Sequence, residues 1–568
     1  MRKARTPTTV RRSFLLCVFL LLALAGVAGK LVWLQAIEAP AFAQQAESQR
    51  LKEWEIPAQR GAIFDREGTP LAIGVEGREV YAVPREVADP EATARALADV
   101  LGGDPEDYLG RLTLDTTFVY LARKVDMERA EALADLDLDG IHFRRDSIRA
   151  YPNGTLAAQA IGFVGIDGYG LEGLEQHYES VLAGTPGQIR AERDSGLRAI
   201  PGGMIEETSP VDGSSLILTL DAEIQYEAQR LLRGAIEKTD AKSGTVTVLD
   251  PDDGSVLALA AYPEFDPNRF SEEEPSAFRN RAITDVYEPG STMKPFIAAA
   301  AIEAGLFGPD DVFDLPPTVE VGGYTIRESH PRERVRWTLE EIIAHSSNVG
   351  VVTVGQALGP DAIYEALRRY GFAQTTDIDL PGEVPGYLPE PDRWSASTIG
   401  NIPFGQGISI TPIQLARSMA VIANGGRLVT PHLVESIPDR PDIDLSWPTR
   451  QVMDPDTAAV MRRVLRTAVE EGTGGKARVP GYPTAGKTGT AQKPRSDGRG
   501  YAKGAYVASF AGFLPADDPA VVIVVTVDEP VNGHYGGTVA APVFRELGRF
   551  CMSHLAVPPP SSGGGEGE

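Results

Sequence analysis

Cysteine is almost absent from this sequence, which has only Cys17 and Cys551 among its 568 residues. Because Cys17 lies inside an apolar run, the two thiols support neither a disulfide framework nor a Cys-x-x-Cys metal site. The seven histidines are scattered singly along the chain. Since a metal centre needs several such ligands close together, we predict no metal site, and we expect no cofactor.

Positive charge is scarce as well. Asp and Glu number 79 against 54 Lys and Arg, which gives a net charge of −25. Such a chain repels phosphates, and no basic stripe or cluster of stacking aromatic side chains offsets that field. The sequence therefore argues against a nucleic-acid partner. Its length exceeds the size at which one hydrophobic core stops growing, so about two to four domains are expected.

Long hydrophobic runs are missing except for one, at residues 14–34. At 1.5 Å per residue, a helix of this length spans about 31 Å, close to the roughly 30 Å of a bilayer's hydrocarbon core. Five basic residues and no acid precede the run: Arg2, Lys3, Arg5, Arg11 and Arg12. We therefore predict a cytoplasmic basic tail over residues 1–12, a transmembrane anchor over residues 13–35 and export of the remainder.

An alternative for the N-terminus is a signal peptide that is cleaved near the small residues Ala41 and Ala43. This site lies far beyond the end of a long apolar run, so the uncleaved anchor is favoured. At the other end of the chain, residues 556–568 are rich in Pro, Gly and Ser. They cannot bury enough surface to order, which predicts a disordered tail.

Between the anchor and about residue 210, short strand-like runs alternate with short amphipathic helices and many Gly or Pro turns. This pattern predicts a non-catalytic module over residues 36–210. Two stretches in it, residues 60–72 and 168–178, each fit a turn flanked by a strand or a helix.

A new domain is predicted over residues 211–555, where the pattern becomes regular. Asp221 can cap an amphipathic helix. Apolar β-type runs form two hairpins, and with a strand around Lys487 they predict one antiparallel sheet of about five strands, covered by that helix and a final one. The runs lie at residues 244–250, 255–262, 484–492, 506–514 and 520–527. Residues 291–472 look mostly helical, so the expected fold class is α+β with a helical subdomain.

Residues 481–490 match the G-x-x-x-x-G-K-[ST] pattern of a phosphate-binding loop. That pattern binds phosphate when a buried strand precedes it and a helix starts at its Lys-Thr. Here the preceding residues are rich in glycine and charge, and Pro494 with several glycines follows, so neither flank fits. An ATPase stays as the alternative, and an edge strand that carries a cationic Lys487 is favoured.

A second short pattern is Ser291-Thr-Met-Lys294, which follows a loop ending in glycine and opens a helix. Positions i and i+3 share a helix face, so Ser291 Oγ and Lys294 Nζ can meet. Backbone N–H groups at a helix N-terminus can stabilise a developing oxyanion. Taken alone, the pattern is common, and a solvated helix face is its plain interpretation.

A third pattern, Ser346-Ser347-Asn348, is a polar break in an apolar helical stretch. Its plain interpretation is a helix cap, because Ser and Asn favour helix starts and turns. Buried polar side chains need hydrogen-bond partners, however. What favours a functional interpretation is the order of the three patterns along the chain, the last being Lys487-Thr488-Gly489.

This combination resembles the penicillin-binding and serine β-lactamase superfamily, whose signature S-x-x-K, S-x-N and K-[ST]-G is met residue by residue. Residues 60–68 and 170–175 look like the pedestal motifs of class B penicillin-binding proteins, and residues 404–416 and 423–426 look like their transpeptidase domain. The resemblance implies that the first predicted domain is a dimerisation-type pedestal and the second a transpeptidase domain. Within class B, the sequence motifs are most similar to those of the septal, cell-division type, and the elongation type is the next most similar.

The reaction implied by the resemblance is acyl transfer from a D-alanyl-D-alanine stem peptide to Ser291, and then to an amine of a neighbouring stem. Serine is a weak nucleophile and needs a base within reach, which in this motif is Lys294. The lysine must first be neutral, and burial together with a second cation, Lys487, can lower its pKa. Ser346 would relay the proton to the leaving amine, and Asn348 would hold Lys294 and the substrate amide.

The strand motif is implied to bind substrate. Lys487 and the hydroxyls of Thr488 and Thr490 would bind the terminal carboxylate of the stem peptide. Gly489 would leave room for the substrate to lie along this edge as an added strand. By family analogy, the backbone N–H groups of Ser291 and Thr490 form the oxyanion hole. β-Lactams would acylate Ser291 because their strained amide occupies the same place.

The implied location is the bacterial inner membrane, with a cytoplasmic N-terminus and a periplasmic catalytic domain. Implied partners are peptidoglycan stem peptides, β-lactams, the membrane, a polytopic glycosyltransferase and other division proteins. Alternatives are a D,D-carboxypeptidase or β-lactamase, which passes the acyl group to water, and a membrane-tethered β-lactam sensor or scaffold. The anchor and the long first domain argue against a small secreted hydrolase, and a scaffold would need no Lys294.

Overall fold

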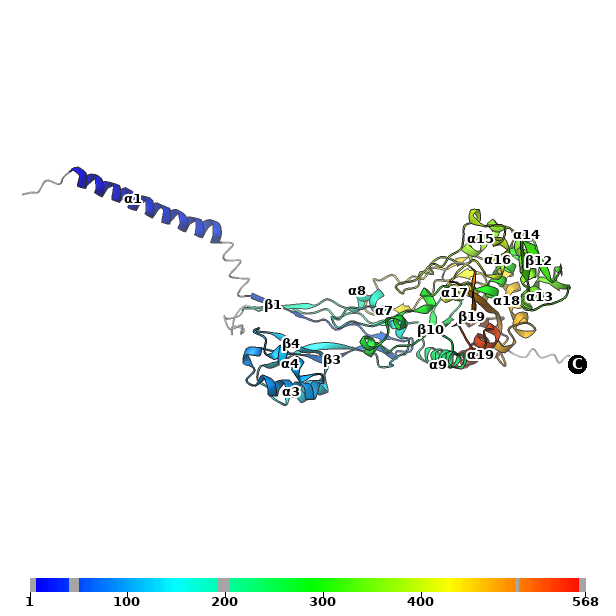
Figure 1. Cartoon of the computed structure of the whole chain (residues 1–568), viewed down its shortest axis with the longest axis horizontal. Helices are drawn as coiled ribbons and strands as arrows, with labels where there is room; N and C mark the ends of the chain where they lie inside the picture. Colours follow the sequence, from blue (N-terminus) through cyan, green and yellow to red (C-terminus); the bar gives the residue numbers. More distant parts are fainter. Residues whose placement is uncertain (1–6, 40–50, 193–204, 496–499, 561–568) are drawn as a thin grey trace, which may run out of the picture. The chain divides into compact units, whose positions relative to one another are not determined.

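The computed structural model describes residues 7–39, 51–192, 205–495 and 500–560. The alternative cleavage site at Ala41 and Ala43 and the end of the predicted tail, residues 561–568, lie outside the described residues. Contacts divide the chain into two compact units, whose elements Figure 1 colours along the sequence. The units are Met1–Ala58 with Gly184–Asp212, and Gln59–Ala183 with Gly213–Glu568. The predicted domain boundary near residue 210 stays a prediction.

The first unit contains the apolar helix and a small sheet. Helix α1 (Pro7–Val32) continues as a π-helical turn η1 (Trp33–Glu38). Within the described ranges, Val10–Glu38 is the one helix long and apolar enough to cross a membrane, so the predicted apolar segment does form a single helix. The sheet is antiparallel, with the strand order β1 (Leu51–Ile56), β6 (Gly187–Glu192) and β7 (Ile205–Thr208).

Residues 59–183 of the second unit form an N-terminal lobe. Its long strand β3 (Pro70–Ala82) pairs antiparallel with β2, β4 and β5. Val80 of β3 shares a hydrophobic cluster with Leu97 of α3 and Leu133 of α5. The bounds of the other elements are β2 (Ile63–Phe64), η2 (Pro84–Glu86), α3 (Pro90–Leu101), α4 (Pro105–Leu112), β4 (Val119–Asp126), α5 (Met127–Ala134), β5 (Ile141–Ala150), α6 (Ala158–Ile161), α7 (Gly173–His177) and α8 (Glu179–Leu182).

A buried ion-pair network connects the two stretches that the sequence predicts as turns. Arg60 Nε lies 2.7 Å from Glu175 Oε2, Arg149 Nε lies 2.6 Å from Glu175 Oε1, and the Glu175 side chain is fully buried. Asp65 forms the first turn, since its Oδ1 accepts hydrogen bonds from backbone N–H groups within it. Its Oδ2 accepts from Ala222 N at 3.1 Å. These motifs therefore hold the lobe together and tie it to the first helix of the next lobe.

The C-terminal lobe, residues 213–560, is built on a five-stranded sheet with the order β10-β9-β20-β19-β18, in which every pair is antiparallel. The strands are β9 (Ser243–Leu249), β10 (Val256–Tyr262), β18 (Ala485–Pro494), β19 (Tyr501–Leu514) and β20 (Val521–Asp528). The predicted sheet is thus confirmed. Among the described strands β18 pairs with β19 alone, so it is an edge strand, as the edge-strand hypothesis requires.

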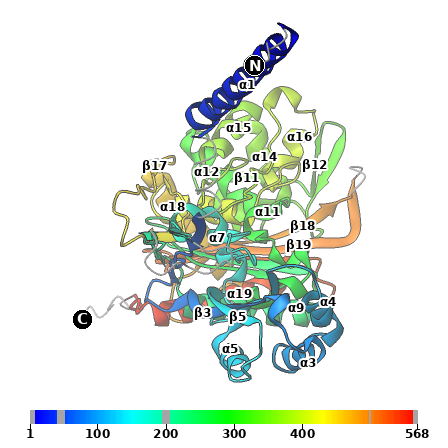
Figure 2. The ribbon, with the colours of Figure 1, turned by 90° about the vertical axis from the view of Figure 1, so that its left-hand side faces the viewer.

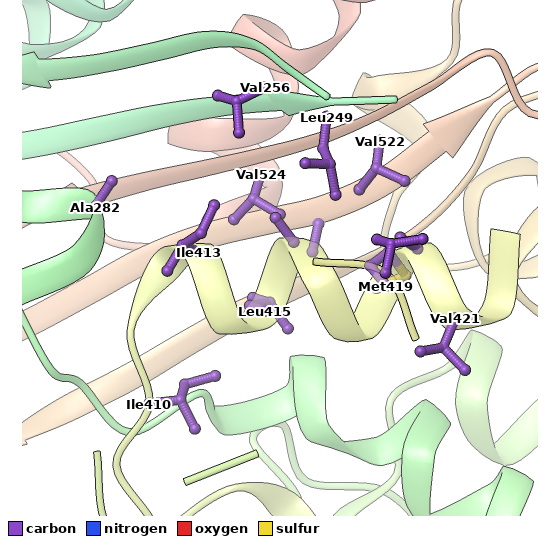
Figure 3. Packing of buried hydrophobic residues seen from close by; sticks show 14 of the residues in the cluster. Leu249, Val256, Ala282, Ile410, Ile413, Leu415, Met419, Val421, Val522 and Val524 are labelled. Atoms are coloured by element: carbon purple, nitrogen blue, oxygen red, sulfur yellow. The ribbon is translucent and has the colours of Figure 1, made fainter. Parts of the chain in front are cut away.

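Helices cover both faces of this sheet. On one face lie α9 (Ala222–Thr239), which Asp221 caps as predicted, and α19 (Gly536–His554). On the other lies α17 (Pro412–Ala423), all of whose residues are buried. Figure 3 shows Ile413 and Met419 of α17 beside Val522 and Val524 of β20, with which they share one hydrophobic cluster. The sheet is therefore the middle of three layers, fixed on both sides by apolar contacts.

Between β10 and β18 most of the regular structure is helical, although loops and short strands make the region less helical than predicted, and Figure 2 shows α12, α14 and α15 across the sheet from α9 and α19. The helices are η3 (Pro267–Glu272), α10 (Pro275–Phe278), α11 (Arg281–Thr284), η4 (Gly290–Met293), α12 (Lys294–Glu303), α13 (Leu339–Ala344), α14 (Asn348–Leu358), α15 (Pro360–Arg369), η5 (Pro391–Arg393), α16 (Thr398–Asn401), η6 (Ile402–Phe404), α18 (Pro455–Glu470) and, just before β18, η7 (Gly475–Ala477). Short strands β8 (Leu216–Leu218), β15 (Arg427–Leu428), β16 (Val434–Ser436) and β17 (Arg450–Gln451) complete the lobe.

One segment of this region departs from the helical prediction. Strands β11 (Val312–Leu315) and β14 (Val335–Thr338) pair antiparallel, as do β12 (Thr318–Val321) and β13 (Tyr324–Arg327). Gly322 and Gly323, with φ of +57° and +80°, make the turn between β12 and β13. Two residues with positive φ are what a tight hairpin turn needs, so this Gly-Gly was the signal that the sequence prediction missed.

Candidate active site

Ser291 and Lys294 lie where a short helix passes into a longer one. Ser291 belongs to η4, and Lys294 is the first residue of α12, with Pro295 in its first turn. Ser291 is partly exposed, whereas Lys294 is fully buried. Both residues therefore lie at a helix start, as the sequence indicates. Among the described contacts, however, the hydrogen bonds of Lys294 Nζ go to other residues, and none joins it to Ser291 Oγ.

The second motif forms a turn between α13 and α14. Ser346 has a φ of +59°, in the left-handed region that residues with side chains rarely adopt. Ser347 is the cap of α14, since its Oγ accepts a hydrogen bond from Gly350 N at 2.9 Å. The plain cap interpretation is therefore correct for the middle residue. Ser346 and Asn348, on either side of it, face Lys294.

Lys294 joins the first two motifs. Its Nζ donates to Ser346 O at 2.5 Å and to Asn348 Oδ1 at 2.7 Å, and it lies 3.2 Å from Ser346 Oγ. Burial, and after it the charge of Lys487, hold the pKa of Lys294 well below its ordinary value, while Glu328 acts in the opposite direction. A neutral amine has a lone pair, so the Ser346 hydroxyl can donate to it. The arrangement suits a base that exchanges protons with Ser346.

Lys487 lies fully buried on β18, opposite Ala511 of β19. Among the described residues its Nζ has only long contacts, at 3.3 Å to Thr488 O, 3.4 Å to Thr488 Oγ1 and 3.4 Å to Thr473 Oγ1. None of these oxygens carries a charge. Burial lowers the pKa of Lys487 to about 7. This ammonium is therefore weakly coordinated, and an anion that reached it would form a stronger, charge-assisted hydrogen bond.

Two glycines let the nucleophile segment approach the strand, since η4 packs directly on β18. A Cβ on Gly290, whose φ is +57°, would lie 3.3 Å from Thr490 O. A Cβ on Gly489 would lie 2.2 Å from Ser509 Oγ and 3.0 Å from Pro289 O. The sequence interpretation gave substrate as the reason for Gly489; the structure shows that the protein's own packing already requires it.

The threonines of the strand motif have partners within the protein. Thr488 Oγ1 lies 2.9 Å from Thr473 Oγ1, and Thr490 Oγ1 accepts a hydrogen bond from Gly536 N at 3.1 Å. A hydroxyl has one donor and two acceptor positions, so Thr490 keeps its proton available for a carboxylate. Its position at the start of α19 also adds the favourable end of that helix's dipole.

The phosphate-loop hypothesis is wrong. Residues 481–490 lead into strand β18, and no helix starts at Lys487 and Thr488. Without that helix, the backbone N–H groups and the dipole that bind phosphate are not directed at Lys487.

A cavity of about 310 Å³ adjoins the site. Gln492 and Lys493 of β18 line it, together with Tyr287 and Glu288 of the loop that leads to Ser291. None of the three motifs contributes a residue to its lining, so it lies beside the candidate site and is not the site itself.

Two residues of the site gave no signal in the sequence. Thr473, which contacts both Lys487 and Thr488, lies in the glycine-rich stretch EEGTGG. Glu328 lies in the charged stretch RESHPRER, which looks like a solvated loop. Its side chain is nevertheless only 8% exposed, and it contacts the Ser346–Asn348 turn.

Two family models match the chain. The Penicillin binding protein transpeptidase domain matches residues 244–548, which is more than half of the chain and includes all three motifs. The Penicillin-binding Protein dimerisation domain matches residues 55–218. This chain belongs to the class B penicillin-binding proteins. The resemblance and the fold class predicted from the motifs are therefore confirmed, and so is the serine acyltransferase class of the enzyme.

Curated relatives match over nearly the whole length. The chain is 34% identical to peptidoglycan D,D-transpeptidase FtsI of Escherichia coli K12, over 94% of this chain and 90% of FtsI. It is 35% identical to penicillin-binding protein PbpB of Mycolicibacterium smegmatis, over 96% of this chain and 90% of PbpB. The crystal structure of penicillin binding protein 3 from Mycobacterium tuberculosis, complexed with aztreonam, has a TM-score of 0.70 at 31% identity, covering 89% of this chain and 99% of that one.

Proposed function

We propose that this chain is a peptidoglycan D,D-transpeptidase that cross-links stem peptides through an acyl-enzyme on Ser291. The observation that carries the proposal is the pair of buried lysines on opposite sides of the site. Lys294 has a pKa well below its ordinary value and contacts Ser346 and Asn348, as a base requires. Lys487 is a cation without a charged partner among its described contacts, as a carboxylate receptor requires.

Acylation begins when neutral Lys294 takes the proton of Ser291 Oγ, which attacks the carbonyl carbon of the penultimate D-alanine. The charge that develops on the carbonyl oxygen is stabilised by the backbone N–H groups of Ser291 and Thr490. The amide C–N bond then breaks, and Ser346 passes the proton from Lys294 to the leaving amine of the terminal D-alanine. Asn348 Oδ1 keeps Lys294 in place throughout.

The strand side of the site binds the donor peptide. Lys487 exchanges its long contacts for the terminal carboxylate, which the Thr488 and Thr490 hydroxyls also contact. After D-alanine leaves, an amine of a neighbouring stem attacks the ester carbonyl carbon. Lys294 takes a proton from that amine, the ester C–O bond breaks, and Ser291 regains its proton as the new amide forms.

The cellular setting is also part of the proposal. The apolar helix and the basic residues before it support a single-pass protein of the bacterial inner membrane, with a cytoplasmic tail and the catalytic lobe outside. Relatives named FtsI support action at the division septum, and the aztreonam-bound relative supports β-lactam binding. A polytopic glycosyltransferase and other division proteins are the proposed partners, bound through the anchor and a pedestal over residues 36–210. An elongation role is the alternative.

Fluorescent penicillin applied to the purified full-length chain tests the nucleophile. We expect a stable adduct on the wild type and on the control Ser553→Ala, which changes an exposed serine of α19, and none on Ser291→Ala. Labelling that persists in Ser291→Ala would defeat the assignment.

Product analysis with a D-alanyl-D-alanine stem peptide separates the enzyme from a hydrolase. With an amine acceptor present, a transpeptidase forms the cross-linked amide as D-alanine is released. A D,D-carboxypeptidase releases D-alanine at the same rate with and without the acceptor, and its only peptide product is the shortened stem.

A further inference from the structure

Glu328 lies directly after β13 and contacts the turn that presents Ser346 to Lys294. Its Oε1 accepts a hydrogen bond from Ser347 Oγ at 2.6 Å, and its Oε2 accepts one from Asn348 N at 2.6 Å. One buried carboxylate thus bridges two successive residues of the turn. These are short, charge-assisted hydrogen bonds, which are about twice as strong as neutral ones.

The turn needs such support. Ser346 is held at a φ of +59°, a conformation that is costly unless the surrounding structure fixes it. Asn348 is fixed on two further sides, because its Nδ2 donates to Arg327 O at 2.9 Å and its Oδ1 accepts from Lys294 Nζ. The end of β13 therefore supplies both the backbone oxygen and the carboxylate that place Asn348. Glu328 also stands at the N-terminus of α14, where the helix dipole favours a negative charge.

The negative charge of Glu328 acts on Lys294. From β18, the positive charge of Lys487 lowers the pKa of Lys294, whereas Glu328 raises it against the larger effect of burial. Behind Glu328, Arg332 pairs with its carboxylate at 2.7 Å, and the Arg332 guanidinium lies 5.0 Å from the centre of the Trp337 ring. Glu328 and Arg332 are only 8% and 13% exposed, so solvent screens their charges weakly.

We infer that Glu328 is a positioning residue of the acyl-transfer reaction: it holds the Ser346–Asn348 turn against Lys294 and supplies the charge that opposes Lys487 at that amine. Arg332 moderates this charge and keeps it in place. The inference rests on the proposed function, in which Lys294 is the base. It explains why a carboxylate from a charged loop is buried against the turn that carries Ser346 and Asn348.

The pH profile of penicillin acylation tests the inference, because a structural role alone would not move it. The acid limb reports loss of the proton from Lys294 in the unliganded enzyme. Glu328→Gln removes a charge that favours protonated Lys294, so its acid limb should move to lower pH. Its rate constant should also fall by about tenfold at the optimum, because the neutral amide holds the turn less well. Glu328→Asp keeps the charge, so its acid limb should stay near that of the wild type.

Two matched variants sharpen the test. Glu333→Gln removes an exposed carboxylate from the same loop and should leave both the profile and the rate unchanged. Arg332→Gln removes the cation behind Glu328, so its acid limb should move the opposite way, to higher pH. Thermal unfolding midpoints show which variants fold, and if Glu328→Gln does not fold, the Arg332→Gln profile decides.

An unchanged acid limb in folded Glu328→Gln, or a limb of Arg332→Gln that does not move to higher pH, would overturn the inference. Failure of the proposed function has a different signature, since the wild type itself would then form no adduct on Ser291. A uniform loss of rate at every pH, with no movement of the limb, would reduce Glu328 to a structural role and so also refute the inference.

Discussion

The two buried lysines of the site differ in how closely the protein coordinates their amines. On the helical side, Lys294 is closely held, with oxygens at 2.5, 2.7 and 3.2 Å. On the strand side, Lys487 has three oxygens at 3.3 and 3.4 Å. Burial lowers the pKa of both side chains, and the charge of Lys487 lowers the pKa of Lys294 further. Tight contacts fix a base in position, and loose ones leave a cation ready to bind substrate.

This difference follows from the secondary structure that carries each residue. Lys294 starts a helix beside a turn whose carbonyl and amide groups point at it, so the protein supplies its partners. Lys487 lies on an edge strand, next to a backbone edge that no described strand covers. An extended peptide can add to an unpaired strand edge by strand pairing. Lys487 therefore lies where the terminal carboxylate of a bound stem peptide would be.

Removing the amine on the helical side should have the largest effect. Lys294→Met keeps the buried apolar stem but deletes the base, so we expect the acylation rate constant for penicillin to fall about 10²- to 10⁴-fold. Stopped-flow or gel measurements of adduct formation give this rate. The control Lys242→Met changes a lysine that is 70% exposed and should react like the wild type. A Lys294→Met rate within threefold of the wild type would show that Lys294 is not the base.

Removing the amine on the strand side should reduce the acylation rate less, and the size of the reduction should depend on the ligand. Lys487→Met loses a charge-assisted hydrogen bond to the carboxylate, so we expect second-order acylation by penicillin to fall about 10- to 100-fold. The methyl ester of the same penicillin lacks that charge, so the Lys487→Met substitution should change its acylation rate only slightly. Lys294→Met should slow both ligands alike. If Lys487→Met slows the acid and the ester equally, the carboxylate does not bind at Lys487.

The pH dependence should separate the two lysines in the wild type. Lys487, with its pKa lowered to about 7 by burial, is protonated below that pH and largely neutral above it. Binding of a carboxylate needs the protonated form, so second-order acylation by penicillin should fall by up to about tenfold per pH unit above pH 7. The methyl ester should not show this fall. A rate that keeps rising to pH 9 with the carboxylate ligand would contradict the assignment.

Crowding at the strand should produce the smallest effect, on stability. In Gly489→Ala the new methyl group meets Ser509 Oγ and Pro289 O, so we expect a lower thermal unfolding midpoint and a cost of about 1–3 kcal/mol. Calorimetry of the full-length chain measures the midpoint. Gly234→Ala, where nothing lies within 4 Å of the added Cβ, is the matched control and should not be destabilised. A Gly489→Ala midpoint equal to that of the control would show that the strand shifts to accommodate the methyl group without loss of stability.

Much of the catalytic lobe could be predicted from local patterns. The five strands were visible because each is a run of apolar β-type residues bounded by turns, and Asp221 marked the first helix. The hairpin of β12 and β13 was missed because its strands are short and exposed, although Gly322 and Gly323 marked the turn. The pairing of β1 with β6 joins residues far apart in sequence, and no local pattern indicates such a partner.

Some residues of the candidate site could also be predicted from local patterns, and others could not. Ser291, Lys294 and Lys487 could be found because each occupies a fixed place in a short motif. Glu328 and Thr473 could not, because their roles depend on side-chain contacts with residues distant in sequence. A buried carboxylate in a charged loop looks like a solvated one until the fold places it against a helix start.

The most direct test of the division between the two lysines is an NMR titration of the full-length chain with lysine-selective ¹⁵N labelling, assigned with Lys294→Met and Lys487→Met. We expect Lys294 to lose its proton well below the ordinary pKa of a lysine side chain. We also expect a Lys487 ammonium that titrates near pH 7 and becomes harder to deprotonate when a carboxylate ligand binds. A Lys294 that stays protonated to pH 10, or a Lys487 whose titration ignores the ligand, would contradict the account.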